Sequence, residues 1–160
     1  MIRVFFCVFT LSVAVSAQGQ GEIQRKLVGH WRLLTFENFD EKGVARPSQY
    51  DSGRIMYDAA GNMSAQLMNT KRKPLSQPST EAERAASYSG FVAYYGRYTI
   101  DPALAKITHH VEGALNPNWV TTDLVRFYAF SPDGNRLMLS IKNGDRVTGT
   151  LTWERITPTK

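Results

Sequence analysis

The chain has 160 residues, 42% of them hydrophobic and 21% charged, which is typical of one globular domain with a buried core. Its formal net charge of +5 is mildly basic, and no dense basic stripe marks a nucleic-acid-binding surface. Phosphate-loop and dinucleotide-binding glycine motifs are absent, as is the Gly-x-Ser-x-Gly motif of serine hydrolases. Nucleotide-dependent and serine-hydrolase functions are therefore excluded at the level of motifs.

The N-terminal segment has the pattern of a secretory signal peptide. Arg3 supplies a positive charge, residues 4–15 form an apolar run, and small residues lead to a cleavage site after Ala17. An uncleaved anchor is the alternative, although this run is short for a membrane span. Cleavage removes Cys7, the only cysteine, and lowers the formal charge from +5 to +4 because Arg3 is the one charged residue lost. We expect residues 1–17 to be the signal peptide and residues 18–160 to be a single secreted or periplasmic domain.

After a segment over residues 23–28 that predicts one or two helical turns, the chain has the pattern of an all-β domain. Runs with β-branched and aromatic residues are separated by turn sequences, of which Asn143-Gly144-Asp145 is a strong hairpin signal. Residues 44–52 have the composition of a loop. The predicted strands cover residues 31–39, 54–58, 62–68, 91–100, 107–113, 120–130, 137–142 and 147–156.

One helix interrupts these strands. Thr80 and Glu83 have the spacing of a capping box, in which each side chain accepts a hydrogen bond from the backbone N–H of the other residue. An alanine-rich run follows to about Tyr88, and Gly90 ends it. The sequence therefore predicts one short helix inserted after the third strand.

The last strand shows the alternation of faces most clearly. Val147, Leu151 and Trp153 share one face, while threonines and Glu154 share the other, so one face is buried and the other solvated. Sequential hairpins predict an antiparallel meander, and closing it removes the exposed edges. We predict an antiparallel up-and-down β-barrel of about eight strands, with room for one small ligand. A two-sheet sandwich is the structural alternative.

A set of motifs, in this order, resembles the bacterial and fungal lipocalin-like domain proteins, which have calycin-type barrels. The resemblance covers nearly the whole mature chain and implies a small barrel with a ligand cavity, without implying one activity. The motifs are Leu27-Val28-Gly29-His30-Trp31, Gly61-Asn62-Met63-Ser64-Ala65-Gln66, Ala93-Tyr94-Tyr95-Gly96, His109-His110-Val111-Glu112-Gly113, Pro117-Asn118-Trp119 and Leu151-Thr152-Trp153-Glu154-Arg155.

Three residues carry the most general part of this resemblance. Gly29 and Trp31 on the first strand, with Arg155 near the end of the last, resemble the lipocalin pattern. In that pattern the tryptophan packs at the closed end of the barrel under a basic residue, which implies a structural role for these residues. Unlike many secreted lipocalins, the mature chain has no cysteine for a disulfide.

The strand over residues 107–113 concentrates the groups that can hold a proton, a metal or a polar ligand. If its apolar face lines the lumen, His109 points inward and His110 points to solvent. Desolvation would then lower the pKa of His109, which could bind a ligand or act as a general base. The alternative is a core histidine whose ring nitrogens are satisfied by a tyrosine or a backbone carbonyl.

If the strand faces the other way, His110 and Glu112 lie on the same inner face and could chelate a metal. A zinc site would need about two more ligands, and His30 is the only other histidine in the sequence. We expect no metal and no cofactor. Asp123 and Arg126 can pair with the histidine strand across the ladder, in a buried network or an outward salt bridge. The residues predicted to bind a ligand are His109, His110, Glu112, Trp119, Tyr57, Gln66, Tyr95 and Arg126, with Tyr94 a further donor to the lumen.

The leading functional hypothesis is a secreted or periplasmic protein that holds a hydrophobic or aromatic small molecule in the barrel lumen. The first alternative is an isomerase, cyclase or dehydratase that uses His109 as its acid/base in a dry pocket. The second is a structural, envelope-associated barrel without a ligand. We expect no nucleic-acid partner and no stable membrane insertion after signal cleavage.

Overall fold

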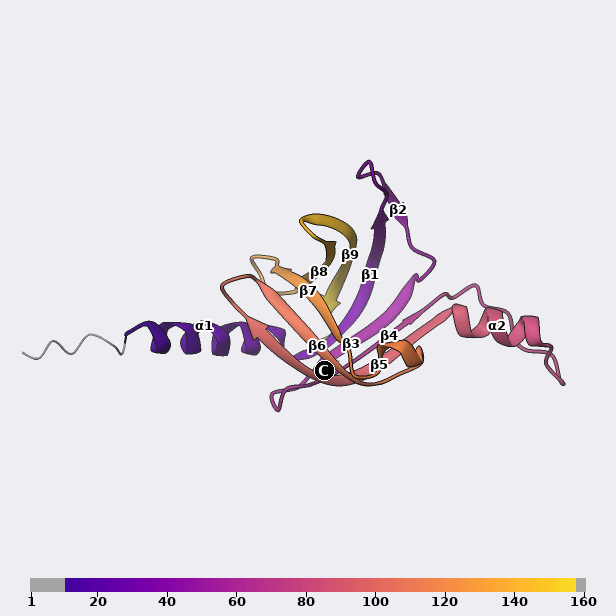
Figure 1. Cartoon of the computed structure of the whole chain (residues 1–160), viewed down its shortest axis with the longest axis horizontal. Helices are drawn as coiled ribbons and strands as arrows, with labels where there is room; N and C mark the ends of the chain where they lie inside the picture. Colours follow the sequence, from indigo (N-terminus) through magenta and orange to yellow (C-terminus); the bar gives the residue numbers. More distant parts are fainter. Residues whose placement is uncertain (1–10, 158–160) are drawn as a thin grey trace, which may run out of the picture.

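The computed structural model describes residues 11–157, with strands that curve around a common interior and two helices that extend away from them (Figure 1). Each strand from β3 onward pairs with the next one in the chain, always antiparallel. The elements are α1 (Leu11–Leu27), β1 (Gly29–Phe39), β2 (Ala45–Pro47), β3 (Ser52–Tyr57), β4 (Asn62–Met68), α2 (Glu81–Ser89), β5 (Phe91–Asp101), β6 (Lys106–Ala114), the 3-10 turn η1 (Pro117–Trp119), β7 (Asp123–Phe130), β8 (Arg136–Asn143) and β9 (Arg146–Arg155).

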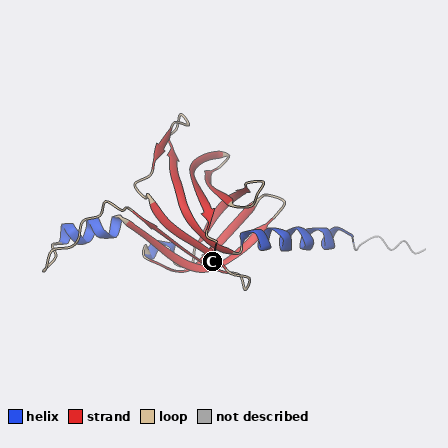
Figure 2. Ribbon diagram, turned by 180° about the vertical axis from the view of Figure 1, so that it is seen from behind, coloured by secondary structure: helices blue, strands red, loops and turns tan. Residues whose placement is uncertain are grey.

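The pairing of the first strand with the last closes the barrel. β1 pairs with β3 on one side and with β9 on the other, in a register that runs from Trp31 opposite Arg155 to Asn38 opposite Gly149. The barrel therefore has eight strands, which confirms the predicted up-and-down barrel and excludes the sandwich. β2 is a ninth, three-residue strand that pairs only with the far end of β1, and the loop composition around it gave no strand signal. Figure 2 shows the same strands from behind.

Two predicted boundaries differ from the structure. The predicted strand over residues 120–130 begins only at Asp123, because η1 and a positive φ of 63° at Thr121 turn the chain before it pairs. α1 continues on the N-terminal side of the expected helical turns, so the expected cleavage point after Ala17 lies inside it. Residues 1–10 of the predicted signal peptide lie outside the described residues. Within residues 11–157, no helix combines the length and hydrophobicity that a membrane span requires.

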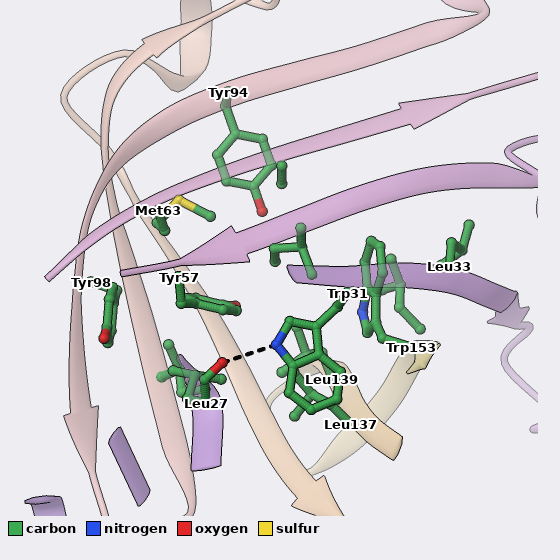
Figure 3. Close-up of a cluster of buried hydrophobic side chains, with 14 of the residues drawn as sticks. Leu27, Trp31, Leu33, Tyr57, Met63, Tyr94, Tyr98, Leu137, Leu139 and Trp153 are labelled. Atoms are coloured by element: carbon green, nitrogen blue, oxygen red, sulfur yellow. Dashed lines mark hydrogen bonds between the residues drawn. The ribbon is translucent and has the colours of Figure 1, made fainter. Parts of the chain in front are cut away.

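One end of the barrel is closed by a packed cluster around Trp31, which is fully buried (Figure 3). Its indole N–H donates to the carbonyl of Leu27 at the end of α1, 2.9 Å away. The Arg155 guanidinium lies over the Trp31 ring at 4.1 Å and donates to the Val28 carbonyl at 3.0 Å. Gly29 has a φ of +136°, and a Cβ at this position would lie 2.9 Å from Arg155 Nη1. This arrangement matches the closed end that the resemblance implies.

The strands alternate between a buried inner face and a solvated outer face. On β9, Gly149, Leu151 and Trp153 are buried while the residues between them are partly exposed, as the sequence predicts. α2 begins with the predicted capping box of Thr80 and Glu83 and has no buried residues, so it lies outside the core. The core is therefore the interior of the barrel, and that interior positions the candidate site.

Candidate functional site

The interior of the barrel contains a cavity of about 400 Å³. Most of the side chains around it are aliphatic or aromatic, and none of these lining residues, all in the described part of the chain, is acidic. Every strand of the closed barrel except β6 contributes, with η1 and the segment before β3 adding one aromatic residue each. The cavity is lined by Phe36, Tyr50, Ile55, Ala65, Leu67, Val92, Tyr94, Trp119, Leu124, Arg126, Leu139, Ile141, Leu151 and Trp153.

Aromatic side chains border the cavity at the end of the barrel away from Trp31. Phe36 stacks on Tyr50, with ring centroids 6.4 Å apart and an interplanar angle of 13°. Trp119, placed by η1, packs edge-on against Tyr94 with centroids 5.9 Å apart. Such rings present flat apolar surfaces that suit a hydrophobic or aromatic ligand.

His109 is fully buried and lies between two tyrosines. Its Nε2 is hydrogen-bonded to the hydroxyl of Tyr57 at 2.8 Å, and its Nδ1 to the hydroxyl of Tyr94 at 3.0 Å. In Figure 3 both tyrosine rings point into the clustered interior of the barrel. A neutral imidazole has one donor and one acceptor nitrogen, so one tyrosine donates to the ring and the other accepts from it.

Burial controls the charge state of this cluster. Desolvation lowers the pKa of His109 well below its ordinary value, and the positive charge of Arg126 adds to the effect. Desolvation also raises the pKa of both Tyr57 and Tyr94, while Arg126 opposes the rise. All three groups are therefore neutral near pH 7, and they form a satisfied polar network within the core.

The neighbouring histidine belongs to the outer face. His110 Nδ1 is hydrogen-bonded to Asp123 at 2.7 Å and its Nε2 to the Thr99 hydroxyl at 2.9 Å. Glu112 is exposed at a bulge where the β5–β6 register shifts. Within residues 11–157 the structure brings together no group of three or more histidine, cysteine, aspartate or glutamate side chains that can hold a metal ion.

Four of the residues predicted to bind a ligand lie on the outer face of the barrel. Gln66 and Tyr95 lie on the outer face, and Tyr95 is 58% exposed. Gln66 alternates with the buried Ala65 and Leu67, while Tyr95 follows the buried Tyr94, so both side chains point outward. His110 and Glu112 point outward for the same reason, opposite in phase to His109.

Trp119 and Arg126 line the cavity as expected, whereas Tyr57 and His109 are core residues that do not border it. This geometry favours the alternative in which His109 is a core histidine satisfied by tyrosine. Because both of its ring nitrogens already have partners, it has no free nitrogen for proton transfer to a bound molecule. The residues that line the cavity can bind and orient a molecule.

Arg126 occupies the inner face of β7, opposite Ile107 of β6. Asp123 is on the outer face of the same strand, so the two residues separate, and only Asp123 forms the outward pair with a histidine. The sequence left both arrangements open because neither face of residues 123–130 is uniformly apolar. Among the described residues, the guanidinium of Arg126 is thus the one charged group that lines the cavity.

The model of the lipocalin-like domain matches residues 28–156, the whole barrel. The chain belongs to the family of lipocalin-like domains. No curated protein matches it. Among solved structures, a redesigned β-barrel is similar at 12% sequence identity and a TM-score of 0.45, over 84% of this chain and 95% of that one. A likeness at that level says nothing of the ligand, so the site of this lipocalin-like protein is interpreted from its own side chains.

Several lining residues were missed in the sequence, among them Phe36, Tyr50, Val92, Leu139 and Ile141. Period-two alternation along β8 was a usable signal for Leu139 and Ile141, because both share a face with the buried Leu137. Tyr50 had none, since it lies in a segment with the composition of a loop.

Proposed function

We propose that this lipocalin-like protein binds one small hydrophobic or aromatic molecule in its barrel lumen. The observation that carries the proposal is the cavity of about 400 Å³, lined mainly by apolar side chains with a few convergent polar groups. Ligand sites in proteins commonly have this size and composition. Family membership is consistent with small-molecule binding and names no ligand.

The difference between the two ends of the barrel supports entry of a ligand at the end away from Trp31. Trp31, Leu27 and Arg155 pack together at one end of the barrel, where Trp31 and Leu27 are fully buried. The aromatic side chains of Phe36, Trp119 and Tyr50 are only partly buried and border the cavity at the other end. We therefore propose that a ligand enters between these rings.

We also propose that the mature protein acts in the periplasm or outside the cell, after cleavage behind Ala17. The support is the order of a positive residue, an apolar run and small residues at the N-terminus. Expression in a bacterial host that exports proteins, followed by N-terminal sequencing, should give Gln18 as the first residue. A product that starts at Met1 and stays in the cytoplasm would contradict this assignment.

The lumen proposal is tested with aminoanthracene, a neutral aromatic fluorophore whose emission rises in apolar surroundings. Leu124 lines the cavity, whereas its neighbour Val125 points outward and is 37% exposed. Leu124→Trp should therefore obstruct the lumen, and Val125→Trp adds the same indole to the outside of the same strand. We expect saturable binding by the wild type and Val125→Trp, and at least about tenfold weaker binding by Leu124→Trp.

Circular dichroism and thermal unfolding establish that both variants are folded. If the wild type shows no saturable uptake, or if Leu124→Trp binds as tightly as Val125→Trp, the lumen is not the binding site.

A further inference from the structure

Arg126 is a cation that faces an apolar cavity without an acidic partner. No aspartate or glutamate in residues 11–157 forms an ion pair with it. Its Nη1 donates to the carbonyl of the adjacent Val125, at 2.8 Å, and a hydrogen bond from its side chain to the Tyr94 hydroxyl opposes the rise in the pKa of that tyrosine. A guanidinium has five N–H donors, so most of its hydrogen-bonding capacity is unused by this part of the chain.

A second donor in the cavity wall is also unused. Trp153 is 1% exposed and lines the cavity, and its indole Nε1 has no hydrogen-bond partner within residues 11–157. A buried donor without a partner costs about 1–3 kcal/mol, so it marks a place where a bound molecule can supply an acceptor. The unused hydrogen-bonding capacity of the lumen therefore consists of donors.

The tyrosine hydroxyls of the cavity wall do not supply acceptors for these unused donors. The Tyr94 hydroxyl is hydrogen-bonded to His109, and the Tyr50 hydroxyl donates to the Ser89 carbonyl at 3.1 Å. Tyr94, Tyr57 and His109, whose pKa values Arg126 lowers, are all neutral near pH 7. The lumen thus has a positive potential from Arg126, in surroundings where a low dielectric strengthens attraction to an anion.

We propose that the ligand of the lumen is an amphipathic carboxylate, with its headgroup bound by the Arg126 guanidinium and its apolar tail filling the cavity. The planar fork of a guanidinium matches the two oxygens of a carboxylate, and such charge-assisted hydrogen bonds are the strong ones. One arginine balances one negative charge, which favours a monoanion over a phosphate dianion. This inference rests on the proposed function, because it names the chemical class held by the same cavity.

The test compares acids with alcohols that have the same tail. Decanoate is paired with decanol, and naphthylacetate with naphthylethanol, each as a competitor of aminoanthracene at a pH of about 7.5, where both acids are ionised. The proteins are the wild type, Arg126→Gln, Arg126→Lys and Arg136→Gln. Arg136 is exposed on the outer face of β8, so its substitution changes net charge equally without touching the lumen.

We expect Arg126→Gln to weaken binding of at least one acid by about 10- to 100-fold, while its matched alcohol changes by less than about threefold. Arg126→Lys should retain part of the affinity for the acid, and Arg136→Gln should behave as the wild type. Retained aminoanthracene binding shows that each variant still folds around its cavity.

The proposal is overturned if Arg126→Gln weakens acids and alcohols equally, or if neither acid displaces the fluorophore from a wild-type protein that binds it. In both cases lumen binding stands and only the carboxylate class fails. If the wild type does not bind aminoanthracene or any of the four competitors, the proposed function itself fails.

Discussion

The buried histidine should make the stability of the barrel depend on pH in a definite direction. Desolvation lowers the pKa of His109 well below 6.5, the value expected in the unfolded chain, and Arg126 and His110 act in the same sense. Below about pH 6.5 the unfolded chain therefore binds a proton that the folded protein does not bind. The contribution of His109 to stability is complete above pH 6.5 and is lost as the pH falls from there towards its folded pKa.

The expected magnitude follows from this linkage. Each pH unit between the two pKa values removes about 1.4 kcal/mol from the free energy of unfolding. Lowering the pH from about 7 to about 5 should therefore cost up to about 2 kcal/mol from this residue alone, the limit that applies when its imidazole stays neutral in the folded protein. Other groups titrate in the same interval, so the relevant quantity is a difference between proteins.

The assay is urea unfolding at both pH values for the wild type, His109→Gln and His30→Gln. Glutamine can hydrogen-bond to Tyr57 and Tyr94 but does not titrate, so His109→Gln should lose less stability than the wild type between the two pH values, by up to about 2 kcal/mol. His30 is exposed on the outer face of β1, and its variant should follow the wild type. An equal loss in the wild type and His109→Gln would refute the assignment of His109 as a neutral, buried group.

Three further substitutions test the fold that holds the cavity. Arg155→Met removes the contact with Trp31 and the hydrogen bonds to the carbonyls of Lys26 and Val28, and should lower the free energy of unfolding by about 2 kcal/mol, measured in urea. Gly96→Ala places a Cβ 2.0 Å from the carbonyl oxygen of His110, so a loss of about 3 kcal/mol or more in the same assay is expected; an unchanged midpoint would contradict this β5–β6 contact. Thr80→Ala removes the cap of α2, which has no buried residues, so hydrogen exchange within α2 should accelerate while the global unfolding midpoint stays constant.

The barrel was predictable because the buried and exposed faces of its strands appear in the sequence as an alternation of residue types. β4, β6 and β9 alternate between apolar and polar residues, and turn residues separate the strands, so the strand order followed from the pattern, which favoured a closed barrel over a sandwich. β2 was not predictable, since three residues without a buried side chain leave no periodic signal. The delayed start of β7 also had no signal, because Thr121 takes a positive φ that its residue type does not favour.

The sequence predicted which side chains of the histidine strand face inward, but it did not predict which residues form hydrogen bonds with them. Ile107 and Val111 indicated that His109 faces inward, yet the two tyrosines that engage its nitrogens come from β3 and β5, far away in the sequence. Arg126 was named as a candidate, but its place on the inner face depends on how β7 packs against its neighbours. Long-range contacts of this kind decide whether a polar group is satisfied, and a single sequence does not specify them.

The structure of the protein in complex with decanoate would test the central claim most directly. The account predicts that the tail fills the cavity between Trp119 and Trp153, with the carboxylate within hydrogen-bonding distance of the Arg126 guanidinium. A saturated complex with the ligand on the outer face of the barrel and the cavity empty would contradict it.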